Sequence, residues 1–246
     1  MKLSFALLTA IGVAGLAQCA SAADITGTVT LSGTPPAERE ITPLNNDPVC
    51  GKINSGKVST TFYVVGANKE LADVIVMLKG QGISAKTADA SAAPVVMEQK
   101  GCLYTPQIVA VQAGQKLIMK NSDPASVPMH NVRINPTAGP NVEAFSTRMS
   151  QTQMSGSADL TYVFPAPENF LKFQCDVHPW MFAWVTVVDN PYFAITGKDG
   201  KFTIKNVPPG KYTISALHYK LAKTGVDKEV EVKDSGASVD FTLEVK

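Results

Sequence analysis

The sequence lacks an excess of charge of either sign and has few long apolar runs. Its 246 residues carry 22 Lys and Arg against 21 Asp and Glu, a net charge of +1. Because phosphate binding requires a net basic face, this balance argues against a nucleic-acid partner. The one apolar run near the start, Leu3–Ala17, is too short to cross a bilayer comfortably. We therefore expect no membrane span and no electrostatic attachment to a membrane.

The beginning of the chain has the pattern of a secretory signal peptide. Lys2 precedes the apolar run, and Ala20-Ser21-Ala22 supplies an A-x-A cleavage site. We predict a signal peptide over residues 1–22, cleaved near Ala22, and a periplasmic or secreted mature protein. The alternative is lipidation at Cys19, for which the preceding Gln18 is a poor fit.

Cysteine is scarce, and the number left after cleavage is odd. The mature chain keeps Cys50, Cys102 and Cys175 in a compartment where thiols oxidise. An odd count leaves one sulfur free or gives it another task. Cys50 and Cys102 both lie in turn-like contexts, and we expect them to form a disulfide, with two free thiols as the alternative. Cys175 is then the sulfur available for function.

The mature chain also lacks any ten-residue segment with the apolar periodicity of a helix. Ile25–Leu31 alternates apolar residues with threonine, and Ser238–Val245 alternates as cleanly at the other end. The segment 121–160 is rich in Asn, Ser, Pro and Met, and it is too long to be a simple connecting loop without a function. These patterns predict an all-β protein.

The strand pattern divides the chain into two units. Residues 59–190 form the larger unit, and residues 191–246 form a smaller β-sandwich that contains a hairpin signal at Asp199-Gly200. A unit of that size buries little core alone. We therefore expect residues 23–58, an N-terminal strand and linker, to pair with it; the alternative is that the small unit packs closely on the larger one.

One segment carries the chemistry. Residues 173–181 contain the spacing C-x2-H-x2-M in Cys175, His178 and Met181, between two predicted strands. Two histidines and one cysteine in a plane, with a weak axial methionine, make a blue copper electron-transfer site. The segment supplies three of these ligands. His130, which follows the predicted strand Lys116–Lys120, is the candidate for the fourth.

This arrangement resembles the cupredoxins. Residues 121–123 carry N-x-D after a strand, His130-Asn131 follows, and the Cys-His-Met loop comes about 45 residues later, with a short spacing similar to that of amicyanin. The resemblance implies a Greek-key β-sandwich in which His130, Cys175, His178 and Met181 bind one type 1 copper. It also implies that Asn131 hydrogen-bonds across to the ligand loop.

The C-terminal segment G-K-D-G-K-F-T-I-K-N-V-P-P-G-K-Y-T-I, from Gly197, resembles the carboxypeptidase regulatory-like (prealbumin-like) β-sandwich. The whole chain is thus similar to bacterial exported proteins that join a plastocyanin or methylamine-utilisation type cupredoxin to such a sandwich. Gln107 and Arg133 stand where that group often has further histidines. The loop before His130 is lengthened by Ser126–Met129.

We expect an electron carrier rather than an enzyme. It would be a monomer that exchanges single electrons with a redox partner protein, a cytochrome, dehydrogenase or oxidase, through the exposed edge of His178. One alternative is copper storage or delivery, with Met129, Met149 and Met154 as further thioether ligands. Another is a binding module whose C-terminal sandwich engages a partner protein or a glycan.

Other interpretations of the same residues are weaker. A nucleophilic Cys175–His178 pair has no orienting acid or oxyanion hole, zinc has no use for Met181, and a binuclear copper centre needs a second cysteine in the loop. His218 shares a face with apolar residues, which predicts a buried core or interface histidine. Trp180 is expected at the surface as a docking patch, and Trp184 inside the sandwich.

Overall fold

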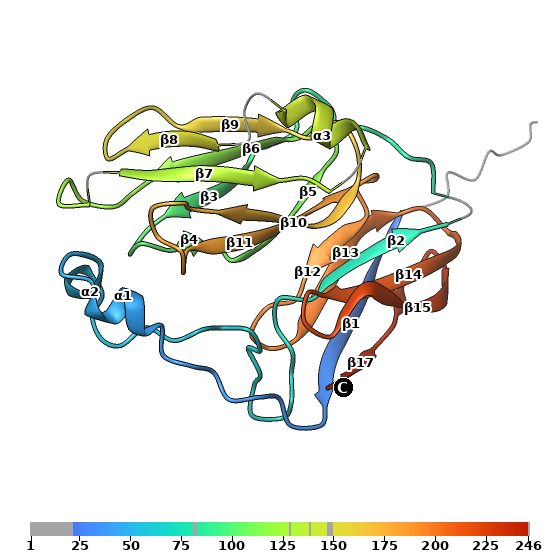
Figure 1. Ribbon diagram of the computed structural model, residues 1–246. Coiled ribbons are helices and arrows are strands. Elements are labelled where there is room, and N and C mark those ends of the chain that lie inside the picture. Colours follow the sequence, from blue (N-terminus) through green and yellow to red (C-terminus); the bar gives the residue numbers. More distant parts are fainter. Residues whose placement is uncertain (1–21, 81–82, 128, 138, 147–149, 246) are drawn as a thin grey trace, which may run out of the picture.

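The computed structural model describes residues 22–80, 83–127, 129–137, 139–146 and 150–245. In these ranges the chain folds into two β-sandwiches, with three short helices (Figure 1). The all-β fold class is therefore confirmed. No helix within the described ranges is long and apolar enough to span a membrane. All but the last residue of the predicted signal peptide lies outside them.

The larger sandwich consists of two sheets that enclose one apolar core. Alternation places Leu171 and Phe173 of one sheet against Leu117 and Tyr162 of the other, all of them buried. The first sheet has the order β5 (Ile108–Gln112), β11 (Phe182–Val188), β10 (Glu168–Gln174), β7 (Met129–Asn135), β8 (Ser150–Met154). The second has the order β4 (Tyr104–Thr105), β3 (Val95–Gln99), β6 (Lys116–Asn121), β9 (Leu160–Val163).

The smaller sandwich combines segments from both ends of the described chain. Its first sheet has β1 (Ala23–Ser32) between β13 (Lys201–Val207) and the short β16 (Ala237–Ser238), with β17 (Phe241–Glu244) also on β1. Its second sheet has the order β12 (Phe193–Ile195), β2 (Ile75–Lys79), β14 (Gly210–His218), β15 (Ala222–Val232). The apolar side of β1, including Ile25 and Val29, packs in the core with Phe241.

The structure moves one expected domain boundary. Strand β2, which we expected inside the larger unit at 59–190, pairs antiparallel with β12 and β14 of the smaller sandwich. Its residues Val76 and Leu78 are fully buried in that sandwich's core. The continuous larger sandwich therefore begins near β3, and the smaller one is assembled from three separated parts of the sequence.

Aromatic side chains fill the contact between the sandwiches. Alternation along β11 places Phe182 and Trp184 on one side of the strand, but this is the side away from the core of the larger sandwich. The Trp184 ring lies 5.8 Å from Tyr219, and the Phe62 ring lies 6.1 Å from Tyr219. The expectation that Trp184 packs inside the sandwich is therefore wrong, because Ala183 and Val185 occupy the inward positions.

The helices α1 (Thr42–Asn46) and α2 (Cys50–Ile53) form a compact segment apart from both sandwich cores; α3 (Gly139–Phe145) lies elsewhere. We call residues 41–58 the cap. Asp47 Oδ1 accepts the amide protons of Val49 and Cys50 and so starts α2. Asn45 exchanges two hydrogen bonds with the backbone of Val58, which closes the segment. In Figure 1 the cap lies at the end of the larger sandwich where β7 begins.

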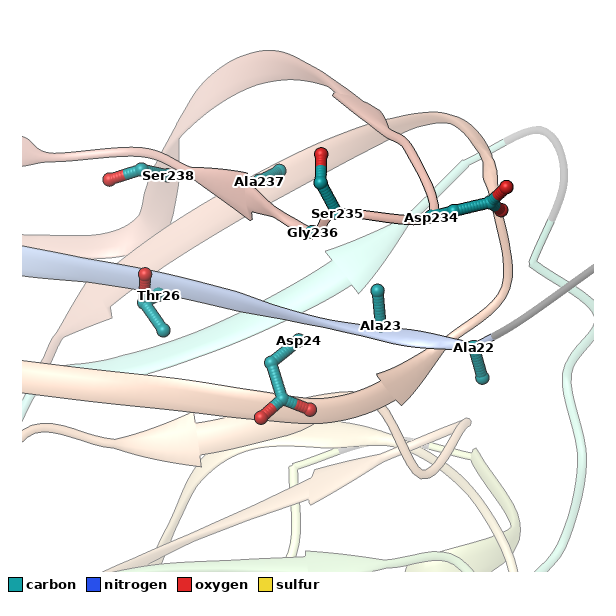
Figure 2. A pocket seen from close by; sticks show the side chains of 9 residues that line it. All are labelled: Ala22, Ala23, Asp24, Thr26, Asp234, Ser235, Gly236, Ala237 and Ser238. Carbon is teal, nitrogen blue, oxygen red and sulfur yellow. The ribbon is translucent and has the colours of Figure 1, made fainter.

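A shallow cavity of about 660 Å³ lies at the other side of the molecule, where β1 begins beside the turn that leads into β16 (Figure 2). Its lining includes the carboxylates of Asp24 and Asp234 but no histidine or cysteine. Asp24 is already paired with Lys205 at 2.5 Å. None of the predicted metal ligands lines this cavity.

Candidate metal centre

The loop between β10 and β11 places three of the predicted ligands. The amide of Cys175 donates to the Met181 carbonyl at 3.0 Å, and the amide of Met181 donates to the His178 carbonyl at 2.9 Å. These bonds close residues 175–181 into a tight turn at the end of the sandwich. Cys175 and Met181 are both buried and belong to its core.

His130 comes from the neighbouring strand β7 and is fully buried. Its Nδ1 lies 3.0 Å from Nδ1 of His178, and the Cys175 sulfur lies 3.8 Å from the same His178 nitrogen. One ligand atom from each of the three residues lies within 4.8 Å of the others. The structure thus brings His130, Cys175 and His178 together around one point.

The surroundings favour the anionic form of the sulfur. Burial alone would raise the pKa of the Cys175 thiol, but hydrogen bonds with His130, His178 and the Asn131 amide lower the pKa to about 6. The thiolate is the form of cysteine that binds metals. The cluster therefore offers one thiolate and two imidazoles to the same point.

Asn131 joins β7 to the ligand loop. Its Nδ2 donates to Asp176 at 2.7 Å, and its Oδ1 accepts the Asp176 amide proton at 2.5 Å. Its own amide donates to the Cys175 sulfur at 3.5 Å. Arg133 pairs with the other side of Asp176 at 2.8 Å and holds the pKa of that carboxyl at about 2. Arg133 is therefore an anchor for the ligand loop.

Asp123 is the acidic residue of the N-x-D segment, but we assigned it no role in the site from the sequence. Its Oδ2 lies 2.8 Å from Nε2 of His130, and both side chains are nearly inaccessible. Burial opposes the ionisation of Asp123, yet hydrogen bonds from His130, Cys102 and Gly101 lower its pKa. Burial likewise disfavours protonation of His130, yet Asp123 and Cys175 raise its pKa. Only the fold reveals this pair, because a spacing of seven residues across an irregular loop has no periodic signature.

The cap covers His178. Cys50 and Cys102 form the predicted disulfide, with an S–S distance of 2.08 Å, and its sulfur atoms lie within 4.8 Å of a ring nitrogen of His178. His178 is only 9% exposed. The expected exposed histidine edge is therefore wrong, because the disulfide, whose Cys50 begins α2, lies beside the His178 ring.

Trp180 lies beside His178 as expected, but it is half-buried rather than an open surface patch. Its ring lies 5.2 Å from His178, and its Nε1 donates to the Cys102 carbonyl at 3.1 Å. It packs against a small apolar cluster that joins the cap to the sandwich, formed by Leu44, Cys50, Cys102 and Val127. Val127 belongs to the lengthened loop before His130, so that extra length helps to hold the cap.

The remaining candidates lie outside the three-residue cluster. Met129 and Met154 are cross-strand partners on β7 and β8, while Met149 falls outside the described residues. Gln107 contacts Thr61 at 3.1 Å. His218 is fully buried in the smaller sandwich, where its ring stacks on Tyr63 at 5.9 Å. Among the described residues, the possible metal groups all contain His130 or His178.

The donor set fits copper better than a hard cation. Two imidazoles and a thiolate are ligands of intermediate to soft character, and no carboxylate belongs to the His130–Cys175–His178 group. Because Nε2 of His130 faces Asp123, its Nδ1 is the nitrogen that can face a metal. The residues present therefore fit a mononuclear copper ion, held by His130, Cys175 and His178.

The C-terminal part of the chain is similar to a known domain family. The family model of the second beta sandwich domain of NOMO1-like BOS complex subunits matches residues 192–246. The match covers under a quarter of the chain and includes β12 to β17 but neither β1 nor β2. No curated protein matches the sequence.

Solved structures with similar folds include copper proteins. The copper-containing nitrite reductase of Thermus scotoductus is 16% identical over 42% of this chain, with a TM-score of 0.29, and the chain spans only 25% of that enzyme. The purple cupredoxin of Nitrosopumilus maritimus is 18% identical over 38% of this chain and 99% of its own length (TM-score 0.27). Plastocyanin of Dryopteris crassirhizoma is 18% identical over 39% of this chain and 100% of its own (TM-score 0.32). At such TM-scores, the ligand cluster alone carries the assignment that follows.

Proposed function

We propose that the protein is an exported electron carrier whose larger sandwich binds one type 1 copper. The observation that carries this proposal is the convergence of His130, Cys175 and His178 within 4.8 Å of one another, all three buried. Met181, which closes the ligand loop through its backbone, is the proposed axial ligand. On this proposal the chain joins a cupredoxin of the short-loop type to a prealbumin-like sandwich.

The chain's own residues would make electron transfer efficient. When bound, copper supplies a one-electron couple. The thiolate of Cys175 and the two imidazoles would hold the ion, and the burial of all three side chains would limit the access of water. Asn131 and the backbone bonds of the loop hold the ligands in one arrangement. Little rearrangement would then accompany each electron, which suits a carrier, and we propose a carrier rather than an enzyme.

The first experiment is a visible and EPR spectrum of the mature protein during titration with Cu(II). We expect an intense thiolate-to-copper band that saturates at one equivalent, and its loss in Cys175→Ser. The control is Cys175→Ser refolded and compared with the wild type by far-UV circular dichroism, which should be unchanged. A protein that stays colourless and shows no copper EPR signal would contradict the proposal.

Copper delivery is the second candidate function. The cross-strand pair Met129 and Met154 places two thioether residues beside the ligand strand β7, and thioethers suit Cu(I). Delivery predicts that Cu(I) binds at more than one equivalent and passes to a chelator. A single equivalent of copper that is retained through repeated oxidation and reduction would favour the electron carrier. On the electron-carrier proposal, the redox partner is a cytochrome, a dehydrogenase or an oxidase.

A further inference from the structure

We propose that Asp123 is a positioning residue that sets the reduction potential of the copper centre through His130. This inference rests on the proposed function and deepens it. The carboxylate lies on the far side of the His130 ring from the ligand cluster: Nδ1 of His130 faces His178, and Nε2 faces Asp123 at 2.8 Å. The imidazole thus connects the carboxylate to the metal position.

The contacts of Asp123 keep its negative charge in place. Its Oδ1 accepts the amide proton of Gly101 at 2.5 Å, and its Oδ2 accepts that of Cys102 at 2.9 Å. Gly101 and Cys102 both have left-handed backbones, with φ of 68° and 56°. These two successive amides converge on one carboxylate and so form an anion site, which the Asp123 side chain fills.

The effect on the metal follows from the hydrogen bond. A carboxylate that accepts the Nε2 proton increases the electron density of the imidazole and makes its other nitrogen a stronger donor. A stronger donor stabilises Cu(II) more than Cu(I). Because the pair is almost fully buried, water screens this interaction weakly. Asp123 should therefore lower the reduction potential of the centre.

A second carboxylate near the ligands provides a matched control. Asp176 follows Cys175 directly in the sequence, but it contacts Asn131 and Arg133 and no ligand ring. It is also exposed and neutralised by Arg133. Asp123→Asn and Asp176→Asn therefore each remove one carboxylate charge near the site, and only the first changes the hydrogen bond to a ligand histidine.

The test compares reduction potentials of the copper-loaded wild type and the two variants by voltammetry. We expect Asp123→Asn to keep the blue band and to weaken Cu(II) binding relative to Cu(I) at least tenfold, which raises the potential by about 59 mV for one electron. Asp176→Asn should shift the reduction potential by less than half of that amount. A blue Asp123→Asn protein with an unchanged potential would overturn the inference and leave the proposed function intact.

A second measurement needs no variant. In the Cu(I) form of the ¹⁵N-labelled wild type, the Nε2 proton of His130 should appear as a downfield NMR signal that exchanges slowly with water. Its absence, or rapid exchange, would overturn the inference even if Asp123→Asn failed to fold. A wild type that forms no blue site would refute the proposed function and this inference together, so the two failures are distinguishable.

Discussion

Removal of the Cys50–Cys102 disulfide should destabilise the larger sandwich and uncover its metal centre. The bridge joins residues 52 positions apart. In the chain-entropy model, a loop of this length contributes about 4 kcal/mol to the free energy of unfolding. We therefore expect the double variant Cys50→Ala/Cys102→Ala to lose about 4 kcal/mol in the copper-free form. Both tryptophans belong to segments of the larger sandwich, Trp180 to the ligand loop and Trp184 to strand β11, so their fluorescence during denaturant unfolding measures the loss.

The same variant should also speed electron exchange. The disulfide lies beside His178. Without it, the cap keeps the contacts of a small apolar cluster and the hydrogen bond that Asn54 Nδ2 donates to the Gly101 carbonyl at 3.0 Å. We expect the copper-loaded variant to be oxidised by ferricyanide at least tenfold faster than the wild type in stopped-flow experiments. The control is Leu171→Ala, which removes a fully buried side chain that does not belong to the apolar cluster of the cap and costs about 2–5 kcal/mol. It should lower stability without changing the oxidation rate.

Two results would refute this reasoning. A loss of less than about 1 kcal/mol would show that the bridge does not restrict the unfolded chain as the loop length requires. An oxidation rate that stays at the wild-type value, or rises equally in Leu171→Ala, would show that the cap does not limit access to His178.

The remaining predictions concern the axial ligand and a buried histidine. Met181→Leu should retain one copper and the blue band but change the reduction potential, and an unchanged potential would contradict the axial assignment. Burial, with a smaller effect of Lys220, lowers the pKa of His218 to about 4, so the unfolded chain binds its proton first as the pH falls. The stability from neutral His218 should be complete above pH 6.5 and decline by about 3 kcal/mol towards pH 4. Denaturant titrations should show this decline in the wild type and a smaller one in His218→Gln; equal declines would contradict it.

The sequence predicts the ligand loop because its chemistry is local. Cys175, His178 and Met181 are three residues apart, and alternation in the flanking segments indicates the strands that hold them. His130 could also be named, because few histidines are available. The all-β class follows from the same alternation, which leaves no room for a long amphipathic helix.

The parts that the sequence did not predict depend on contacts between distant segments. The helices of the cap are five and four residues long, too short for a helical period to be visible. The sequence predicts a buried strand at Val74–Leu78. It does not predict which sandwich contains this strand, because an apolar run fits either core equally well. The surroundings of Trp184 could not be predicted either, because alternation predicts which residues share a face and not what that face contacts.

The interleaved path of the chain has a consequence for biosynthesis. The larger sandwich runs without interruption from β3 to β11, whereas β1 ends at Ser32 and must wait for β13, which begins at Lys201. As the polypeptide emerges, β1 and β2 therefore remain without their strand partners until β12 and β13, which begin at Phe193 and Lys201, have been synthesised. Unpaired strands of this kind are prone to aggregate. A chain that terminated after residue 190 would thus contain all the segments of the larger sandwich and its ligand cluster. Its strands β1 and β2 would stay unpaired and prone to aggregate.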